Sequence, residues 1–407
     1  TMIEPDIVFN PASAMPLPMP VAPPPASAPN GQLHSSATYG YASAPPPPQP
    51  SSQPSYRAVE VTQTLKKQLA QQGYTHGMID ALCKSTTSFP LRIWIVDNSG
   101  SMNIADGQRI VSTVSSTQVK SVQCTRWKEI QETVEYHIQL AGLLKAPTTF
   151  RFLNPPTGGV AQEFSVADKG DDMIGDDITR GVEIIKNSSP TGCTPLAQHV
   201  RQIKDQVQML KDSLNAEGKR IAIIFATDGL PSDDWGVSDQ PQLNEFTEAM
   251  RSLEGLPVWI VVRLCTDSED VVEFYNNLDA NLELSIEVLD NYTDEAKEMY
   301  ATNPWINYSL ALHRMREMGF QHRIFDLLDE RSLTISELRD YCVLLFGNTA
   351  FDGVPEPEVD FKGFLKALER MLGEEKQQWH PVKNKMKPLV SLKKLNEKYG
   401  DGTCTIM

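Results

Sequence analysis

The chain has 407 residues, 40% of them hydrophobic, and a net charge of −15, so it is long enough for two or three domains with sizeable cores. Its acidic balance argues against nucleic-acid binding, because such binding needs Lys and Arg to replace the counterions of the phosphates. None of its six cysteines forms a Cys-x-x-Cys pair, which argues against a zinc module and is typical of reduced thiols.

Proline dominates the first segment. Residues 1–57 hold 15 of the 29 prolines, with Ala, Ser and Gln between them. This composition predicts a disordered Pro-rich arm with polyproline II character, because it cannot bury enough apolar surface to offset chain entropy. An SH3 or WW domain is the candidate partner of the arm, and a plain solvated tail is the alternative.

Residues 58–88 predict a short helical lead-in to the next domain. Leu65 and Leu69 share one face of a first helix, and Gly73 is placed to end it. Met78 would face inward on a second helix. We expect both helices to pack beside the main sheet.

From residue 89 to 302, apolar runs alternate with helical patterns. Such runs predict a mostly parallel sheet covered on both faces. Repeated strand–helix units predict a doubly wound, Rossmann-like α/β fold, with ligands at the carboxyl ends of its strands. The expected strands are 91–96, 148–153, 221–226, 258–264 and 284–289. The expected helices are 125–145 and the stretch after Pro195. The stretch 108–123 predicts an added hairpin with an antiparallel edge strand.

Oxygen-bearing side chains stand at the ends of these elements. Asp97, Ser99 and Ser101 follow the first strand directly, Asp228 follows the third, and Thr194 lies just before the long helix. Carboxylate and hydroxyl oxygens are hard ligands, which suit Mg²⁺ or Mn²⁺ better than zinc. The sequence therefore predicts one divalent ion held by these five residues.

In these segments the chain resembles the von Willebrand factor type A (vWA) family, over about residues 88–300. The metal-ion-dependent adhesion site of that family has an Asp-x-Ser-x-Ser segment, a distant Thr and a distant Asp, in this order. The resemblance implies that the hydroxyls bind the ion directly, that the acids act directly or through water, and that a carboxylate of a protein partner fills an open position. Asp106, Asp233 and Asp234 are expected to make the rim of the site acidic.

Two alternatives remain open from the sequence. In the first, Asp97 and Asp228 only cap strands and Thr194 only caps a helix, and the protein is a metal-independent scaffold that recruits partners through its Pro-rich arm and helical region. In the second, the chain is a Mg²⁺-dependent phosphatase of the haloacid dehalogenase type. That chemistry needs a second acid two residues after the first, and Ser99 stands there. We therefore expect a binding protein and not an enzyme.

The pattern becomes helical after residue 302. Residues 303–375 predict a helical region, in which Thr334 and Glu337 have the spacing of a capping box. This region carries no signature of a known partner.

The last segment, 376–407, is interpreted as a basic tail, because 376–400 carry seven lysines and one acid. The chain ends in a C-a-a-X-like sequence, which predicts prenylation of Cys404. A prenyl chain and the lysines together predict binding to an anionic membrane, with an unmodified solvated tail as the alternative. No signal-peptide pattern or long apolar run is present, so we expect a cytoplasmic protein, located at the cytoplasmic face of a membrane if prenylated.

Overall fold

The computed structural model describes residues 61–112, 119–266 and 268–400. The predicted Pro-rich arm at 1–57 and the predicted lipidation site at Cys404 lie outside the described residues. Within them, no helix is both long enough and apolar enough to cross a membrane.

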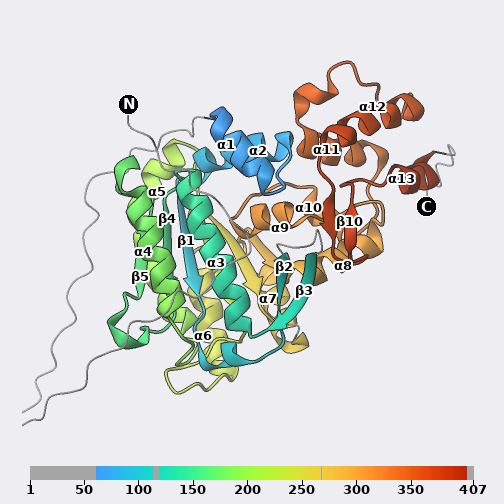
Figure 1. Cartoon of the computed structure of the whole chain (residues 1–407). Helices are drawn as coiled ribbons and strands as arrows, with labels where there is room; N and C mark the ends of the chain where they lie inside the picture. The colour runs from blue at the N-terminus through green and yellow to red at the C-terminus, as the bar shows by residue number, and fades with distance from the viewer. Residues whose placement is uncertain (1–60, 113–118, 267, 401–407) are drawn as a thin grey trace, which may run out of the picture.

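A six-stranded sheet forms the centre of the fold, in the order β5-β4-β1-β6-β7-β8 (Figure 1). Five strands run parallel, and β5 pairs antiparallel with β4 at one edge. This arrangement confirms the predicted α/β class with a mostly parallel sheet. The strands are β1 (Leu91–Val96), β4 (Thr148–Phe152), β5 (Glu163–Val166), β6 (Ile221–Thr227), β7 (Val258–Leu264) and β8 (Ile286–Leu289).

The antiparallel edge strand is not where the sequence predicted it. β2 (Gly107–Ser112) and β3 (Val119–Cys124) form the expected hairpin, but this hairpin is a separate two-stranded sheet. The described side chains of β3 are all at least partly exposed. Ile110 and Val119 of the hairpin pack against an apolar cluster that contains no strand of the main sheet. The edge strand is β5, in which only Phe164 and Val166 are buried.

Helices cover both faces of the sheet (Figure 1). Successive residues of a strand point to opposite faces, so Ile93 packs in one apolar cluster and Trp94 in another. The helices that share the cluster of Ile93 are α5 (Leu196–Ala216), α6 (Gln240–Arg251) and α7 (Glu269–Asn281), and those that share the cluster of Trp94 are α3 (Arg126–Leu143) and α4 (Ile174–Asn187).

A third apolar cluster joins the two ends of the described chain. It holds residues of the lead-in helices α1 (Gln63–Gln71) and α2 (His76–Ser88) together with residues of the C-terminal elements. The C-terminal elements are α8 (Tyr292–Thr302), α9 (Leu310–Glu317), α10 (Phe325–Leu328), α11 (Ile335–Phe346), α12 (Phe361–Glu374), β9 (Gln378–His380), β10 (Lys385–Lys387) and α13 (Leu392–Tyr399). The predicted capping box at Thr334 is confirmed at the start of α11.

The contact between α2 and α11 is close enough to involve the backbone (Figure 1). A Cβ atom on Gly77 would lie 2.3 Å from the backbone N of Gly347. Nearby, the hydroxyl of Thr75 donates a hydrogen bond to the carbonyl of Leu345. The lead-in helices therefore pack with the C-terminal helices as well as beside the sheet.

Buried charges attach α9 to the sheet. Arg263 of β7 pairs with Glu129 of α3 and with Glu317 of α9, where its Nε lies 3.2 Å from Oε1 of Glu317. Glu317 also contacts His137 at 3.1 Å and Arg314 at 2.7 Å. Because removal of one partner would leave the others charged or polar in a buried place, this cluster ties α3, β7 and α9 to one another.

The lysine-rich segment folds over most of its length. It forms the β9–β10 hairpin and α13, and it buries Trp379, Val390 and Leu395 in the third cluster. Lys383 and Lys394 lie over the ring of Tyr300 on α8, with their Nζ atoms 5.1 Å and 4.4 Å from its centre. The lysines therefore sit on a packed surface.

Candidate metal centre

The sheet topology brings the two acids together. Asp97 follows β1 and Asp228 follows β6, and these strands are neighbours in the sheet. The backbone N–H of Asp97 donates to the carbonyl of Ala226 at 2.9 Å. Because the carboxyl ends of parallel strands meet at one edge, both carboxylates lie there, and both are buried.

The two serines connect these acids. Ser101 belongs to a short 3-10 turn, Gly100–Asn103, directly after Ser99. The two hydroxyl oxygens are 3.0 Å apart, and the hydroxyl of Ser101 donates to Oδ1 of Asp228 at 2.8 Å. The backbone N–H of Ser99 donates to Oδ1 of Asp97 at 2.8 Å. Four of the five predicted ligands therefore form one connected group.

Thr194, the fifth residue, approaches this group from the loop before α5. A Cβ on Gly229, next to Asp228, would lie 3.9 Å from Oγ1 of Thr194. Two hydrogen bonds with Ser232 hold Thr194 in place. The Oγ of Ser232 accepts from the backbone N–H of Thr194 at 2.8 Å, and the backbone N–H of Ser232 donates to the carbonyl of Thr194 at 3.0 Å. The N–H of Gly100 donates to the carbonyl of Gly192 at 3.0 Å, which joins this loop to the serine turn.

Glycine is required in the Thr194 loop. Gly192 has a φ of +86°, and a Cβ there would lie 2.4 Å from Oδ1 of Asn154. Asn154 in turn donates from Nδ2 to the carbonyl of Cys193 at 2.7 Å. The loop thus follows a path that other residues adopt only with strain.

The electrostatics favour a cation. Burial and the neighbouring carboxylate of Asp228 raise the pKa of Asp97 to about 6, although hydrogen bonds from Ser99 and Thr227 oppose this rise. The hydroxyl of Thr227 donates to Oδ2 of Asp97 at 2.6 Å, so both oxygens of Asp97 are engaged. Two buried acids beside hydroxyls are a donor set that fits Mg²⁺ or Mn²⁺, and none of the five residues is a thiol or imidazole that would select zinc.

The described residues contain no cluster of three or more His, Cys, Asp or Glu side chains that could hold a metal ion. The present group differs in composition, because three of its five members are hydroxyls. The donors that this group would offer to an ion are therefore neutral hydroxyl oxygens and two carboxylates.

Arg126 is the residue of this site that sequence analysis missed. It is the first residue of α3, and its Nη1 donates to Oδ2 of Asp228 at 2.9 Å. Its Nε and Nη2 donate to Asp106 at 2.7 Å and 2.6 Å. These bonds hold the pKa of Asp106 below its ordinary value. The available signal was a cation at the first position of a helix, where the helix dipole disfavours positive charge.

Of the predicted acidic rim, Asp106 is bound to Arg126 and Asp233 has a structural role. Oδ1 of Asp233 accepts the N–H groups of Trp235 and Val237, each at 2.9 Å. The resulting turn holds Trp235 with 85% of its surface exposed. Asp234 is exposed, and its carbonyl accepts from Sγ of Cys193 at 3.6 Å, which places this turn beside the Thr194 loop.

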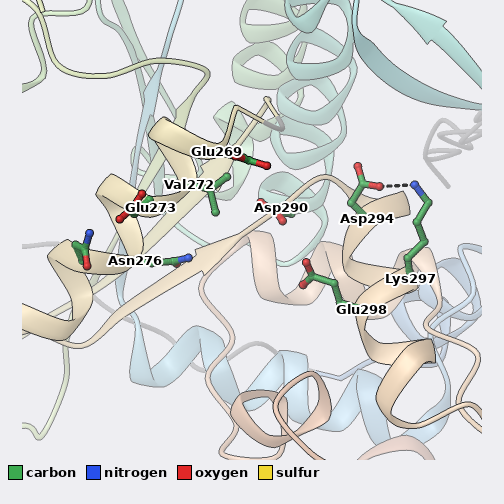
Figure 2. Close-up of a pocket in the computed structure, with 9 residues that line it drawn as sticks. Glu269, Val272, Glu273, Asn276, Asp290, Asp294, Lys297 and Glu298 are labelled. Atoms are coloured by element: carbon green, nitrogen blue, oxygen red, sulfur yellow. Dashed lines mark hydrogen bonds and ion pairs between the residues drawn. The ribbon is translucent and has the colours of Figure 1, made fainter.

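A separate acidic pocket of about 620 Å³ lies between α7 and α8 (Figure 2). Five acids line it together with Lys297, which pairs with Asp294 at 2.5 Å. Burial raises the pKa of Glu298, one of the five, to about 7. None of the predicted ion ligands lines this pocket.

No family model matches the chain, and no curated protein matches it. A mutant of the PilB minor pilin from Streptococcus sanguinis matches with a TM-score of 0.33 and 11% identity, over 49% of this chain and 56% of the pilin chain. At this level of similarity the match carries no inference, so the functional proposal depends on the residues of the site.

Proposed function

We propose that the chain is a vWA-type binding module in which Mg²⁺ or Mn²⁺ captures a carboxylate of a protein partner. Asp97, Ser99, Ser101, Thr194 and Asp228 would hold the ion. The observation that carries this proposal is the connected group of two serine hydroxyls and two buried carboxylates at the carboxyl edge of β1 and β6, with the hydroxyl of Thr194 beside Gly229. The strand order, with helices on both faces of the sheet, supports the doubly wound topology of that family.

The chemistry of the donors favours binding over hydrolysis. The three hydroxyls are neutral, so a bound ion would keep much of its positive charge and would attract a carboxylate. Ser99 stands where a phosphatase of the alternative type needs an acid, and its Oγ bonds to Ser101. A serine there is a poor proton donor at neutral pH.

The surroundings of the site provide apolar contact area. Trp235 and Val237 belong to the turn that follows Asp228, and they are 85% and 47% exposed. Ile104, just after the serine turn, is also 47% exposed. Exposed Trp residues dominate the binding energy of many interfaces, so we expect the partner to present an apolar side chain close to its acid.

Membrane attachment is a separate part of the proposal. Lys376, Lys385, Lys393 and Lys398 are exposed on or beside the β9–β10 hairpin and α13. Such a basic surface supports attraction to anionic lipids, at about 1 kcal/mol for each lysine near the surface. Prenylation of Cys404 stays a prediction from the sequence.

Calorimetric titration of Mg²⁺ and Mn²⁺ into the full chain tests the ion site. Ser99→Ala should weaken binding strongly, because it removes one proposed direct ligand. Ser252→Ala is the matched control, since it deletes a hydroxyl that donates to Ala249 at the end of α6, and its heats should equal those of the wild type. Equal heats from Ser99→Ala and the wild type would contradict the proposal.

A pull-down in Mg²⁺ and in chelator then tests the function. The proposed module captures its partner only with Mg²⁺, and Ser99→Ala loses the capture. A partner retained equally by both proteins in chelator would instead favour the metal-independent scaffold.

A further inference from the structure

We infer that Arg126 is a built-in counter-cation that competes with the divalent ion for Asp228, and that Asp106 holds Arg126 when it leaves Asp228. This inference rests on the proposed function, because it concerns the same ion. In this inference, Arg126 and Asp106 set the affinity for the ion in addition to the five residues that would bind it.

The guanidinium of Arg126 bridges two unlike acids. Toward the interior, Nη1 binds Oδ2 of Asp228, whose side chain is fully buried. Toward solvent, Nε and Nη2 bind the two oxygens of Asp106, whose side chain is 48% exposed. The Arg126 side chain itself is 11% exposed. One end of this bridge therefore lies inside the ion site, and the other end lies at the surface.

The position of Arg126 in α3 is unfavourable for the helix. The first turn of a helix carries partial positive charge, which disfavours a cation there. Thr125 already caps α3 by accepting the N–H of Lys128 at 3.1 Å, so the side chain of Arg126 has no capping role. An arginine is charged at every ordinary pH. Its role at this position is therefore to compensate the two carboxylates.

The same guanidinium stands in the way of an ion. Both oxygens of Asp228 are engaged, Oδ1 by Ser101 and Oδ2 by Arg126. A divalent ion beside Ser101 and Asp228 would meet a positive charge at close range in a poorly solvated place, where repulsion is strong. Ion binding consequently requires that Arg126 give up Asp228. The two-bond contact with Asp106 keeps Arg126 paired after this change.

A partner would shift this balance. Its carboxylate brings negative charge to a site that then contains the ion and Arg126. Both cations gain from that charge, so the ion and the partner should increase each other's affinity by the same factor. Without a partner, Arg126 keeps the affinity for the ion low.

Calorimetric titration of Mg²⁺ into the full-length protein tests the competition with two variants of opposite expected sign. Arg126→Gln removes the competing charge and should tighten Mg²⁺ binding about tenfold or more. Asp106→Asn leaves Asp228 as the remaining carboxylate for Arg126, and should weaken Mg²⁺ binding. A general loss of stability cannot produce both changes, because it does not tighten binding in either variant.

A neighbouring ion pair supplies the controls. Arg109 and Glu132 pair at 2.8 Å, with side chains 36% and 32% exposed. Arg109→Gln and Glu132→Gln remove the same charges as the two test variants, but from a pair that contains none of the proposed ligands. Both should bind Mg²⁺ as the wild type does.

The outcomes separate this inference from the proposed function. If the wild type binds Mg²⁺ and Arg126→Gln binds it equally or more weakly, the competition is disproved and the ion site stands. If Arg126→Gln does not fold, unchanged or tighter binding by Asp106→Asn disproves the competition in its place. If none of the proteins binds Mg²⁺, the proposed ion site fails, and the inference fails with it.

Discussion

At the scale of the residue, Trp235 is the side chain with the most direct bearing on partner binding. Asp233 orders the backbone of its turn through two hydrogen bonds, so this backbone should lose little conformational freedom when a partner binds the exposed indole. Trp235→Ala should weaken partner binding by about 2 kcal/mol, a factor of about 30 in affinity. Surface plasmon resonance with the partner captured in Mg²⁺ measures this change.

Two controls accompany the Trp235 variant. Val359→Ala alters a side chain that is also 85% exposed but lies in the loop before α12, and it should bind the partner normally. Calorimetry should give the same Mg²⁺ affinity for Trp235→Ala and the wild type. Undiminished partner binding by Trp235→Ala would place the interface elsewhere.

A second prediction at this scale concerns Gly192. Gly192→Ala forces a side chain into a left-handed conformation and against Asn154, so it should shift the loop that carries Thr194. We expect a loss of about 1–3 kcal/mol of stability, measured by urea unfolding, and weaker Mg²⁺ binding. Gly158→Ala is the matched control, because Gly158 has a φ of +79° and open space around its Cβ position. A Gly192→Ala protein with normal Mg²⁺ affinity would show that the path of this loop does not position Thr194.

Some residues of this site can be predicted from the sequence and others cannot, because only some of their contacts are local in the chain. Asp97, Ser99 and Ser101 are close in sequence and follow an apolar strand, so their proximity is a local property. Arg126 and Asp106 meet through the placement of the β2–β3 hairpin and the start of α3. Such contacts depend on tertiary packing, which spacing in the sequence does not encode.

At the scale of the element, α9 is held to the sheet by charges whose protonation affects stability. His313 of α9 is buried, and burial lowers its pKa to about 4, while Glu317 opposes and Arg263 and Arg314 support this shift. Between pH 4 and the ordinary value of 6.5, the unfolded chain binds a proton that the folded protein excludes. Stability therefore rises with pH through this window.

His313→Gln should remove this contribution. Its unfolding free energy should change less steeply between pH 4 and 6.5, with a difference from the wild type of about 3 kcal/mol across the window. Urea unfolding at several pH values measures the slopes. His76→Gln serves as the control, because the side chain of His76 is 54% exposed. Parallel slopes for His313→Gln and the wild type would be inconsistent with a neutral His313 in the fold.

The strands that could be predicted from the sequence are those with a clear local pattern of apolar residues. Continuous apolar runs predicted β1, β4, β6, β7 and β8 within a few residues, because buried parallel strands need apolar side chains on both faces. The edge strand β5 has only four residues, and just Phe164 and Val166 are buried, so its pattern is too short to recognise. The β9–β10 hairpin was not recognised because each strand has only three residues and β10, with Lys385 and Lys387, has no buried residue.

At the scale of the whole molecule, the segment after residue 302 completes the core of the sheet region. Glu317 pairs with Arg263 and His137, and the carbonyl of Met318 accepts from Nε of Arg92 at 3.0 Å. A chain that ends at residue 302 loses these partners and exposes the apolar face of α1 and α2.

We therefore expect the truncated chain to lack a cooperative unfolding transition, as followed by circular dichroism in urea. Glu317→Gln in the full chain is the milder test, and should cost about 3–5 kcal/mol because it removes the charge that pairs with Arg263. A truncated chain that unfolds cooperatively at the midpoint of the full chain would show that the two segments fold independently.

The contact between α2 and α11 also has a consequence for biosynthesis. Thr75 and Leu345 are 270 residues apart in the sequence, so a ribosome that adds about 5–20 residues per second needs roughly 15–50 s to make the second after the first. During that time the apolar side chains of α1 and α2, such as Leu69 and Met78, have no C-terminal helices to cover them. The nascent chain thus exposes this apolar segment to chaperones until α11 has been made.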